Sequence, residues 1–230
     1  MPLDITRVRA LCFDIDGTLR DTDDQYVDRL AGYLRQVNFL LLKREPNALA
    51  RRVIMAIEDP GNWVLSLTDR LGIDNLTARL LQSVEKPNSR INPKPPVIPG
   101  VSEMLEALRP RYPLAIISTR SQRFTRDFLD SCHLASYFQV IVSGQTCTRT
   151  KPHPMPVRWA AEQMGVPPEA CLMVGDTTVD IRAGRAAGAQ AVGVLCGFGM
   201  EGELVRAGAH LILKSTSELA GVLLQDDLQA

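Results

Sequence analysis

The sequence predicts an α/β protein with a doubly wound parallel sheet and an inserted, all-helical segment. Two observations predict the core. From Val97 onward, short apolar strands alternate with helical stretches, which is typical of βαβ units. Polar residues follow several of these strands at the carboxyl ends, where open α/β sheets bind ligands. The insert is predicted because residues 20–95 break this alternation.

Each core element has its own pattern. The first strand is an apolar run that ends just before Asp14. The later strands are short apolar runs, predicted at residues 114–117, 138–142, 171–174, 190–194 and 210–213. Helices are predicted at residues 121–129, 154–164 and 178–187, and a last helix is capped by Ser215. Gly188 is expected to end a helix, and Gly184 to allow close packing of a helix on a strand.

The insert is expected to be a separate cap domain of residues 20–95, with residues 1–19 and 96–230 forming the core. Its first helix is predicted by apolar residues at spacings of three and four, namely Tyr26, Leu30, Tyr33, Leu34, Val37 and Leu41. Its second boundary is rich in proline, which favours a stiff linker. A cap joined by two linkers, at about residues 19–22 and 92–99, could hinge on the core, and the prolines of the second linker would limit its range of motion.

Composition narrows the range of functions. The chain has 26 basic and 26 acidic residues, so its net charge of zero creates no field that attracts nucleic acid or an anionic membrane. The five cysteines show no C-x-x-C spacing and are expected to be reduced. The N-terminal segment does not resemble a signal peptide, and no apolar run is long enough to cross a bilayer. We therefore expect a cytoplasmic protein, and the sequence carries no signal for an oligomeric state.

Two aspartates, Asp14 and Asp16, follow the first predicted strand. Like charges this close repel each other and persist only with a cation, a shared proton or water. The next residues, Gly17 and Thr18, allow a sharp turn and offer backbone N–H groups to an anion. The segment is therefore a candidate catalytic loop.

Three other polar segments are expected to converge on this loop. Ser118 and Thr119 follow the second strand, Lys151 precedes a helix, and the fourth strand leads into Asp176 and Asp180. The carboxyl ends of parallel strands meet at one edge of a sheet. Carboxylates suit Mg²⁺, whereas lysine, hydroxyl and N–H groups suit a phosphate.

These four segments, in this order, resemble the motifs of the haloacid dehalogenase-like (HAD) hydrolase superfamily. The motifs are Asp14-Ile15-Asp16-Gly17-Thr18, Ser118, Lys151 and Gly175-Asp176-Thr177-Thr178-Val179-Asp180. Two flanking segments, residues 98–101 and 183–189, are similar to the phosphoglycolate phosphatase-like branch. The insert resembles a type C1 cap in position and size. The resemblance implies a Rossmann-like core and a phosphatase acting on a small phosphorylated metabolite.

The resemblance also implies a role for each site residue. Asp14 would be the nucleophile that forms an aspartyl-phosphate, and Asp16 the general acid and base. Mg²⁺ would be bound by Asp14, the backbone carbonyl of Asp16 and Asp176, with Asp180 as a direct or water-bridged partner. The transferring phosphate would contact a further set of groups, those of Gly17, Thr18, Ser118, Thr119 and Lys151.

Several alternatives stay open at the level of single residues. Thr119 competes with Ser118 as the phosphate-binding hydroxyl, and Asp180 could serve only the N-terminus of its helix. Lys151 could be a solvated lysine. The arginines nearest the motifs, Arg20, Arg120 and Arg123, are expected to be solvated surface residues.

Alternatives also remain for the function. Asp16 argues against a dehalogenase, which needs no acid for an alkoxide leaving group. A sugar-phosphate mutase of the β-phosphoglucomutase type shares the core motifs and is the closest enzymatic rival. A regulatory module that binds phosphate or Mg²⁺ without turnover is a third possibility, but it would need neither a cap nor Asp16.

Overall fold

The computed structural model describes residues 2–21 and 97–224, and every structural statement below concerns these residues. The chain divides into two compact units, residues 1–22 with 93–230, and residues 23–92. The predicted helical cap falls outside the described residues and stays a prediction.

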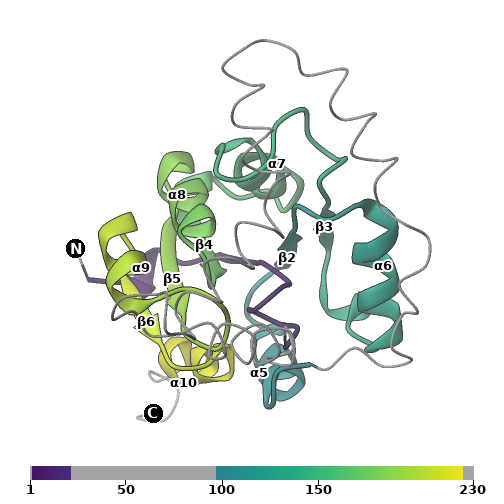
Figure 1. The fold of residues 1–230 in the computed structure, drawn as a ribbon, viewed down its shortest axis with the longest axis horizontal. Coiled ribbons are helices and arrows are strands. Elements are labelled where there is room, and N and C mark those ends of the chain that lie inside the picture. The colour runs from purple at the N-terminus through teal and green to yellow at the C-terminus, as the bar shows by residue number, and fades with distance from the viewer. Residues whose placement is uncertain (1, 22–96, 225–230) are drawn as a thin grey trace, which may run out of the picture. The chain divides into compact units, whose positions relative to one another are not determined.

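The core contains a six-stranded parallel sheet with the order β3-β2-β1-β4-β5-β6 (Figure 1). Its strands are β1 (Ala10–Phe13), β2 (Leu114–Ile117), β3 (Val140–Val142), β4 (Cys171–Gly175), β5 (Gln190–Val194) and β6 (Leu211–Leu213). The chain reverses its direction of winding at β1, which lies between β2 and β4. This order is that of a doubly wound, Rossmann-like sheet, so the predicted fold class is confirmed.

Six α-helices connect or flank the strands in the part of the chain that the structure describes. They are α5 (Val101–Leu108), α6 (Gln122–Ser131), α7 (Met155–Gln163), α8 (Thr178–Ala187), α9 (Glu201–Ala207) and α10 (Leu219–Leu223). Short 3₁₀ helices lie at Ile5–Arg7, Ala135–Tyr137, Pro168–Ala170 and Thr216–Glu218. The expectation that Ser215 caps the last helix is wrong. Ser215 precedes the 3₁₀ helix Thr216–Glu218, and the Ser215 side chain makes no capping hydrogen bond to that helix.

Alternate residues of each strand pack on opposite faces of the sheet. In β1, Leu11 and Phe13 belong to the apolar cluster that also contains residues of α5, α6 and α10. Cys12 belongs to the cluster with α7 and α8, whose members are mostly small. A Cβ on Gly184 would lie 2.7 Å from Met173 Cβ, so glycine is needed for α8 to pack this closely on β4. Helices therefore cover both faces, as Figure 1 shows.

The segments that border residues 22–96 lie side by side in the core. The Ile98 N–H donates to the Leu19 carbonyl at 2.9 Å, and Arg20 and Val97 form an antiparallel β-bridge. The five cysteines are free thiols. No described helix combines the length and the apolar character needed to cross a membrane.

Candidate active site

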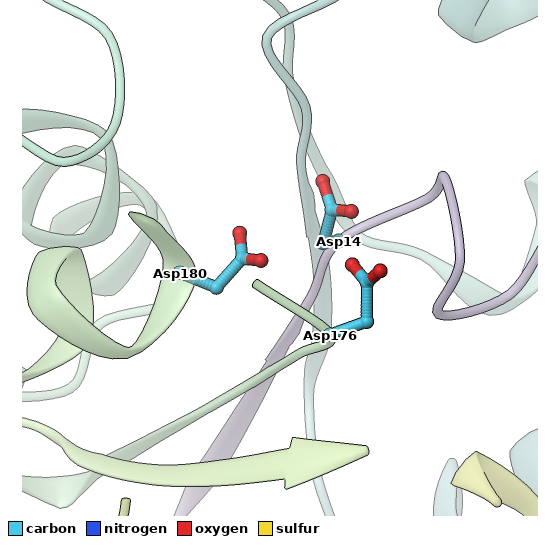
Figure 2. A group of neighbouring side chains, drawn as sticks. All are labelled: Asp14, Asp176 and Asp180. Atoms are coloured by element: carbon cyan, nitrogen blue, oxygen red, sulfur yellow. The ribbon is translucent and has the colours of Figure 1, made fainter. Parts of the chain in front are cut away.

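The predicted site residues come together at the carboxyl edge of the sheet. Asp14 directly follows β1, Ser118 follows β2, and Asp176 follows β4. Asp180 lies in the first turn of α8, and Lys151 lies in the segment between β3 and α7. Figure 2 shows that Asp14, Asp176 and Asp180 extend from three different elements into one small region.

Three buried carboxylates lie together, and two of them bind the same buried lysine. One oxygen each of Asp14, Asp176 and Asp180 lies within 4.8 Å of the others. Lys151 Nζ lies 2.6 Å from Asp14 Oδ1 and 2.6 Å from Asp180 Oδ1. Lys151 is only 4% exposed, so it is not a solvated lysine. A single ammonium can neutralise only one carboxylate of three, so full ionisation of the cluster would leave excess negative charge.

Burial and mutual repulsion shift the pKa values of these groups. Burial raises the pKa of Asp14 to about 7; Lys151 opposes the shift, whereas the charges of Asp180 and Asp16 add to it. Burial also raises the pKa of Asp176 well above its usual range, and Asp180 and Asp14 raise it further. Burial by itself lowers the pKa of Lys151, but the two bonded carboxylates raise it above its usual value. Lys151 is therefore an ammonium, and the carboxylates would be stabilised by additional positive charge.

Asp176 offers the clearest sign of a cation site. Its Oδ2 accepts a hydrogen bond from the Phe198 N–H at 2.8 Å, whereas Oδ1 is buried and has no partner among the described residues. Glycines hold this carboxylate in place: a Cβ on Gly17 or Gly197 would lie 2.7 or 2.6 Å from Asp176 Cγ. A fixed carboxylate oxygen beside two others fits the oxygen ligands that Mg²⁺ prefers.

Asp180 connects this cluster to α8. Its Oδ1 accepts from Lys151, while Oδ2 accepts from the Thr177 N–H at 3.1 Å and from Thr177 Oγ1 at 2.6 Å. Asp180 therefore does stabilise the N-terminus of its helix. The same bonds hold its side chain within the acidic cluster, so the two interpretations considered for it are compatible.

The predicted phosphate-binding residues differ in their environments. Ser118 is 4% exposed and its Oγ accepts from the Arg120 N–H at 3.1 Å, whereas Thr119 is exposed. The backbone N–H groups of Gly17 and Thr18 donate to the carbonyls of Arg20 and Ile15, at 2.9 and 3.2 Å. These two donors are used within the turn, which Gly17 enables with a φ of 74°.

Asp16 is held outside the acidic cluster by two arginines. Arg20 Nη1 lies 3.0 Å from Asp16 Oδ1, and Arg120 Nε lies 3.0 Å from Asp16 Oδ2. The expectation that Arg20 and Arg120 are solvated surface residues is therefore wrong. It is right for Arg123, which is 88% exposed and lies 3.6 Å from Asp127. The sequence does contain a sign of these contacts, namely the closeness of both arginines to motif residues. Arg20 comes four residues after Asp16, and Arg120 comes two residues after Ser118.

Known proteins resemble both the sequence and the fold. A phosphoglycolate phosphatase of Aquifex aeolicus (strain VF5) is 30% identical over 195 residues, which cover 83% of this chain and 86% of that protein. The phosphoglycolate phosphatase of Escherichia coli (strain K12) is 28% identical, covering 94% and 92%. A candidate β-phosphoglucomutase of Thermotoga maritima has 27% identity and a TM-score of 0.66, covering 95% of this chain and 99% of that one.

A family model described as "Haloacid dehalogenase-like hydrolase" matches residues 11–194, which run from β1 through β5. That span contains the acidic cluster, Lys151 and Ser118. The resemblance inferred from the four motifs is thus confirmed by a family model whose match covers all four of them. The chain belongs to the haloacid dehalogenase-like hydrolase family.

Proposed function

We propose that this hydrolase is a Mg²⁺-dependent phosphatase that cleaves the phosphomonoester of a small metabolite through an aspartyl-phosphate on Asp14. The observation that carries the proposal is the buried cluster of three carboxylates, two of which bind Lys151. A cluster with excess negative charge cannot receive a phosphate dianion unless a cation accompanies it. Asp14, Asp176 and Asp180 would hold Mg²⁺, which when bound supplies positive charge to the phosphoryl oxygens.

Asp14 is suited to be the nucleophile because it is buried and held still. Lys151 binds its Oδ1 at 2.6 Å, which leaves Oδ2 to attack phosphorus in line with the leaving oxygen. Lys151 also places a fixed positive charge beside the transferring group. Ser118, buried at the end of β2, would contribute a hydroxyl to a phosphoryl oxygen, in preference to the exposed Thr119.

Asp16 would carry the proton in both half-reactions. It protonates the leaving oxygen while Asp14 forms its bond to phosphorus, which yields the free alcohol and the aspartyl-phosphate. Asp16 then takes a proton from the water that attacks the aspartyl-phosphate. This second step regenerates Asp14 and releases inorganic phosphate.

The relatives support a small phosphorylated metabolite as the substrate, which we expect the enzyme to meet in the cytoplasm. Two of them are phosphoglycolate phosphatases. The Thermotoga maritima structure supports the sugar-phosphate mutase as a second candidate. The two activities differ in the fate of the phosphoryl group, because a mutase returns it to a sugar and a phosphatase transfers it to water.

Product analysis tests the proposal. The full-length protein is incubated with Mg²⁺ and a panel of phosphorylated acids, sugars and nucleotides, and both free phosphate and isomerised phosphosugar are measured. We expect free phosphate that depends on both Mg²⁺ and Asp14, with the exposed α6 variant Asp127→Asn as the matched control. An isomerised phosphosugar without phosphate release would favour the mutase, and a stable phosphoprotein without turnover the regulatory module.

A further inference from the structure

The 3₁₀ helix Thr216–Glu218 lies against the turn that carries Asp16. Thr216 Oγ1 donates a hydrogen bond to the Thr18 carbonyl at 2.6 Å. Both residues are fully buried, and 198 positions separate them in the sequence. Losing the hydroxyl would leave a buried carbonyl without this donor, which is costly because water cannot take its place. The C-terminal part of the core is therefore bound firmly to the loop after β1.

The turn is closed by bonds of its own backbone. The three consecutive N–H groups of residues 18–20 all donate to the Ile15 carbonyl, at 3.2, 2.9 and 2.8 Å. The Gly17 carbonyl takes no part in these bonds and accepts from Cys196 Sγ at 3.5 Å. Cys196 Sγ in turn lies 3.5 Å from Thr216 Oγ1. The turn is therefore a compact unit that two neighbouring side chains of the C-terminal part bind from the core.

The same 3₁₀ helix contacts the segment on which the described chain resumes at residue 97. A Cβ on Gly100 would lie 2.9 Å from the Cβ of Ser217, so the backbone just before α5 passes close to this helix. The neighbouring Ile98 N–H donates to the Leu19 carbonyl at 2.9 Å. Thr216 and Ser217 therefore support, side by side, the two backbone segments that border residues 22–96.

Asp14 and Asp16 depend on this turn to different degrees. Asp14 is fixed at the edge of the sheet, because its N–H donates to the Val174 carbonyl at 3.0 Å and its carboxylate binds Lys151. Asp16 lies two residues further on, within the turn, and one of its partners, Arg20, belongs to the same turn. The position of Asp16 relative to Asp14 is therefore set by how firmly the core holds the turn.

We propose that Thr216 is a positioning residue for the reaction: its hydroxyl, through the Thr18 carbonyl, holds the turn where Asp16 reaches the leaving oxygen. The inference rests on the proposed function, in which Asp16 is the general acid. Thr216 is fully buried and acts on the substrate only through the turn. Its loss should therefore impair proton donation to the leaving group and spare the attack of Asp14 on phosphorus.

Two aryl esters that differ in the basicity of the leaving group test the inference on the full-length protein with Mg²⁺. p-Nitrophenyl phosphate releases a nitrophenolate that needs no proton, whereas 4-methoxyphenyl phosphate releases a far more basic phenolate that does. Thr216→Val keeps the shape of the side chain and removes the hydroxyl. In this variant we expect kcat/KM to fall by about tenfold for the methoxyphenyl ester and by less than about twofold for the nitrophenyl ester.

Further variants attribute the change to the hydroxyl. Thr216→Ser keeps the donor and should keep the wild-type ratio of the two kcat/KM values, whereas Thr216→Ala should change the ratio as Thr216→Val does. Thr125→Val is the matched control, because Thr125 is also fully buried and its hydroxyl has no hydrogen-bond partner within residues 2–21 and 97–224. It should keep the wild-type ratio. Thermal unfolding of each variant verifies that it is folded at the assay temperature.

The outcomes separate this inference from the proposed function. If the wild-type enzyme with Mg²⁺ releases phosphate from neither ester, the proposed function fails. If it releases phosphate but Thr216→Val and Thr216→Ala slow both esters by the same factor, or slow neither, only the role of Thr216 is overturned. The same holds if neither variant folds, because the hydroxyl would then serve the fold as a whole and not the placement of Asp16.

Discussion

Asp14 and Asp16 are two residues apart, yet their surroundings have opposite electrostatic character. Asp14 is buried and shares the ammonium of Lys151 with Asp180. It lies near Asp176, whose Oδ1 has no hydrogen-bond partner within residues 2–21 and 97–224. Asp16 is partly exposed and is bound by two guanidinium groups. The first aspartate therefore lies among other carboxylates, and the second lies between guanidinium groups.

This difference matches the two chemical tasks proposed for the pair. A nucleophile benefits from burial, a fixed position and a bound cation, whereas a residue that gives and takes protons must meet the leaving group and then water. Ile15, which separates the two, is fully buried and anchors the loop in the core. One residue of spacing places the two carboxylates in different environments, as in other enzymes that use two carboxylates for two roles.

The largest effects should come from removing each carboxylate in turn. We expect Asp14→Asn to retain less than about 1% of the activity on every substrate, because it removes the atom that bonds to phosphorus. Asp16→Asn should also turn over poorly, but with p-nitrophenyl phosphate it should still form the aspartyl-phosphate, since nitrophenolate leaves without a proton. Stopped-flow measurement should then show a burst of about one nitrophenolate per active site in Asp16→Asn.

The contrast between the two variants is the informative part of this experiment. A burst in Asp14→Asn, or near-full activity in that variant, would exclude Asp14 as the nucleophile. The absence of a burst in Asp16→Asn, in a protein that still binds Mg²⁺, would mean that Asp16 is needed before the phosphoryl group is transferred. The exposed Asp127→Asn serves as the control in both measurements.

The next largest effect should come from removing the ammonium of Lys151, which binds Asp14. Lys151→Met removes the ammonium from a buried acidic cluster, so we expect the free energy of unfolding without metal to fall by about 3–5 kcal/mol. Added Mg²⁺ should restore part of this loss because it neutralises the same carboxylates. Urea denaturation with a chelator and with Mg²⁺ measures both effects, and the exposed Lys214→Met is the control. Equal stability of Lys151→Met and wild type in the chelator would show that the ammonium is not essential to the cluster.

Replacing Asp176 should change the stability of the protein by a smaller amount, and the sign of the change should differ with and without Mg²⁺. With a chelator at neutral pH, Asp176→Asn should be more stable than wild type, because a neutral amide avoids the cost that burial and the neighbouring carboxylates impose on the Asp176 carboxylate and that raises its pKa. Mg²⁺ at about 100 times its Kd should stabilise wild type by about 2.7 kcal/mol and the variant by much less. Calorimetry with and without Mg²⁺ measures this, and equal stabilisation of both proteins would exclude Asp176 as a ligand.

Most of the fold could be predicted from the sequence. In the core, the local pattern of apolar residues favours the same strands and helices that the packing of the sheet requires. The predicted spans of β2, β5 and α8 coincide with the observed elements. Helices α5 and α9 were not predicted individually, although Val101, Met104, Leu105 and Leu108 in α5 show amphipathic spacing. They lie in stretches where glycine and proline dominate the local signal.

The two sides of the site differ in how far they could be predicted. Parallel strands bring their carboxyl ends together, so the motifs were sufficient to place Asp14, Asp176 and Lys151 near one another. The pairing of Asp16 with Arg20 depends on the turn at Gly17, which brings Arg20 back into a β-bridge with Asp16. Long arginine side chains without periodic spacing give no sign of a partner until the geometry of that turn is known.

The smallest effect should come from removing the hydroxyl of Thr177, which orients Asp180 by a hydrogen bond. Thr177 Oγ1 donates to Asp180 Oδ2 at 2.6 Å, and its backbone N–H donates to the same oxygen at 3.1 Å. Thr177→Val removes the hydroxyl bond and the side-chain part of the capping box at the start of α8, but keeps the backbone bond, so Asp180 should remain in place but less firmly oriented. We expect Mg²⁺ binding to weaken about tenfold, as is typical when a partner of a metal ligand is lost. Titration calorimetry measures this against the adjacent Thr178→Val, and unchanged affinity in Thr177→Val would show that Lys151 and the backbone suffice to orient Asp180.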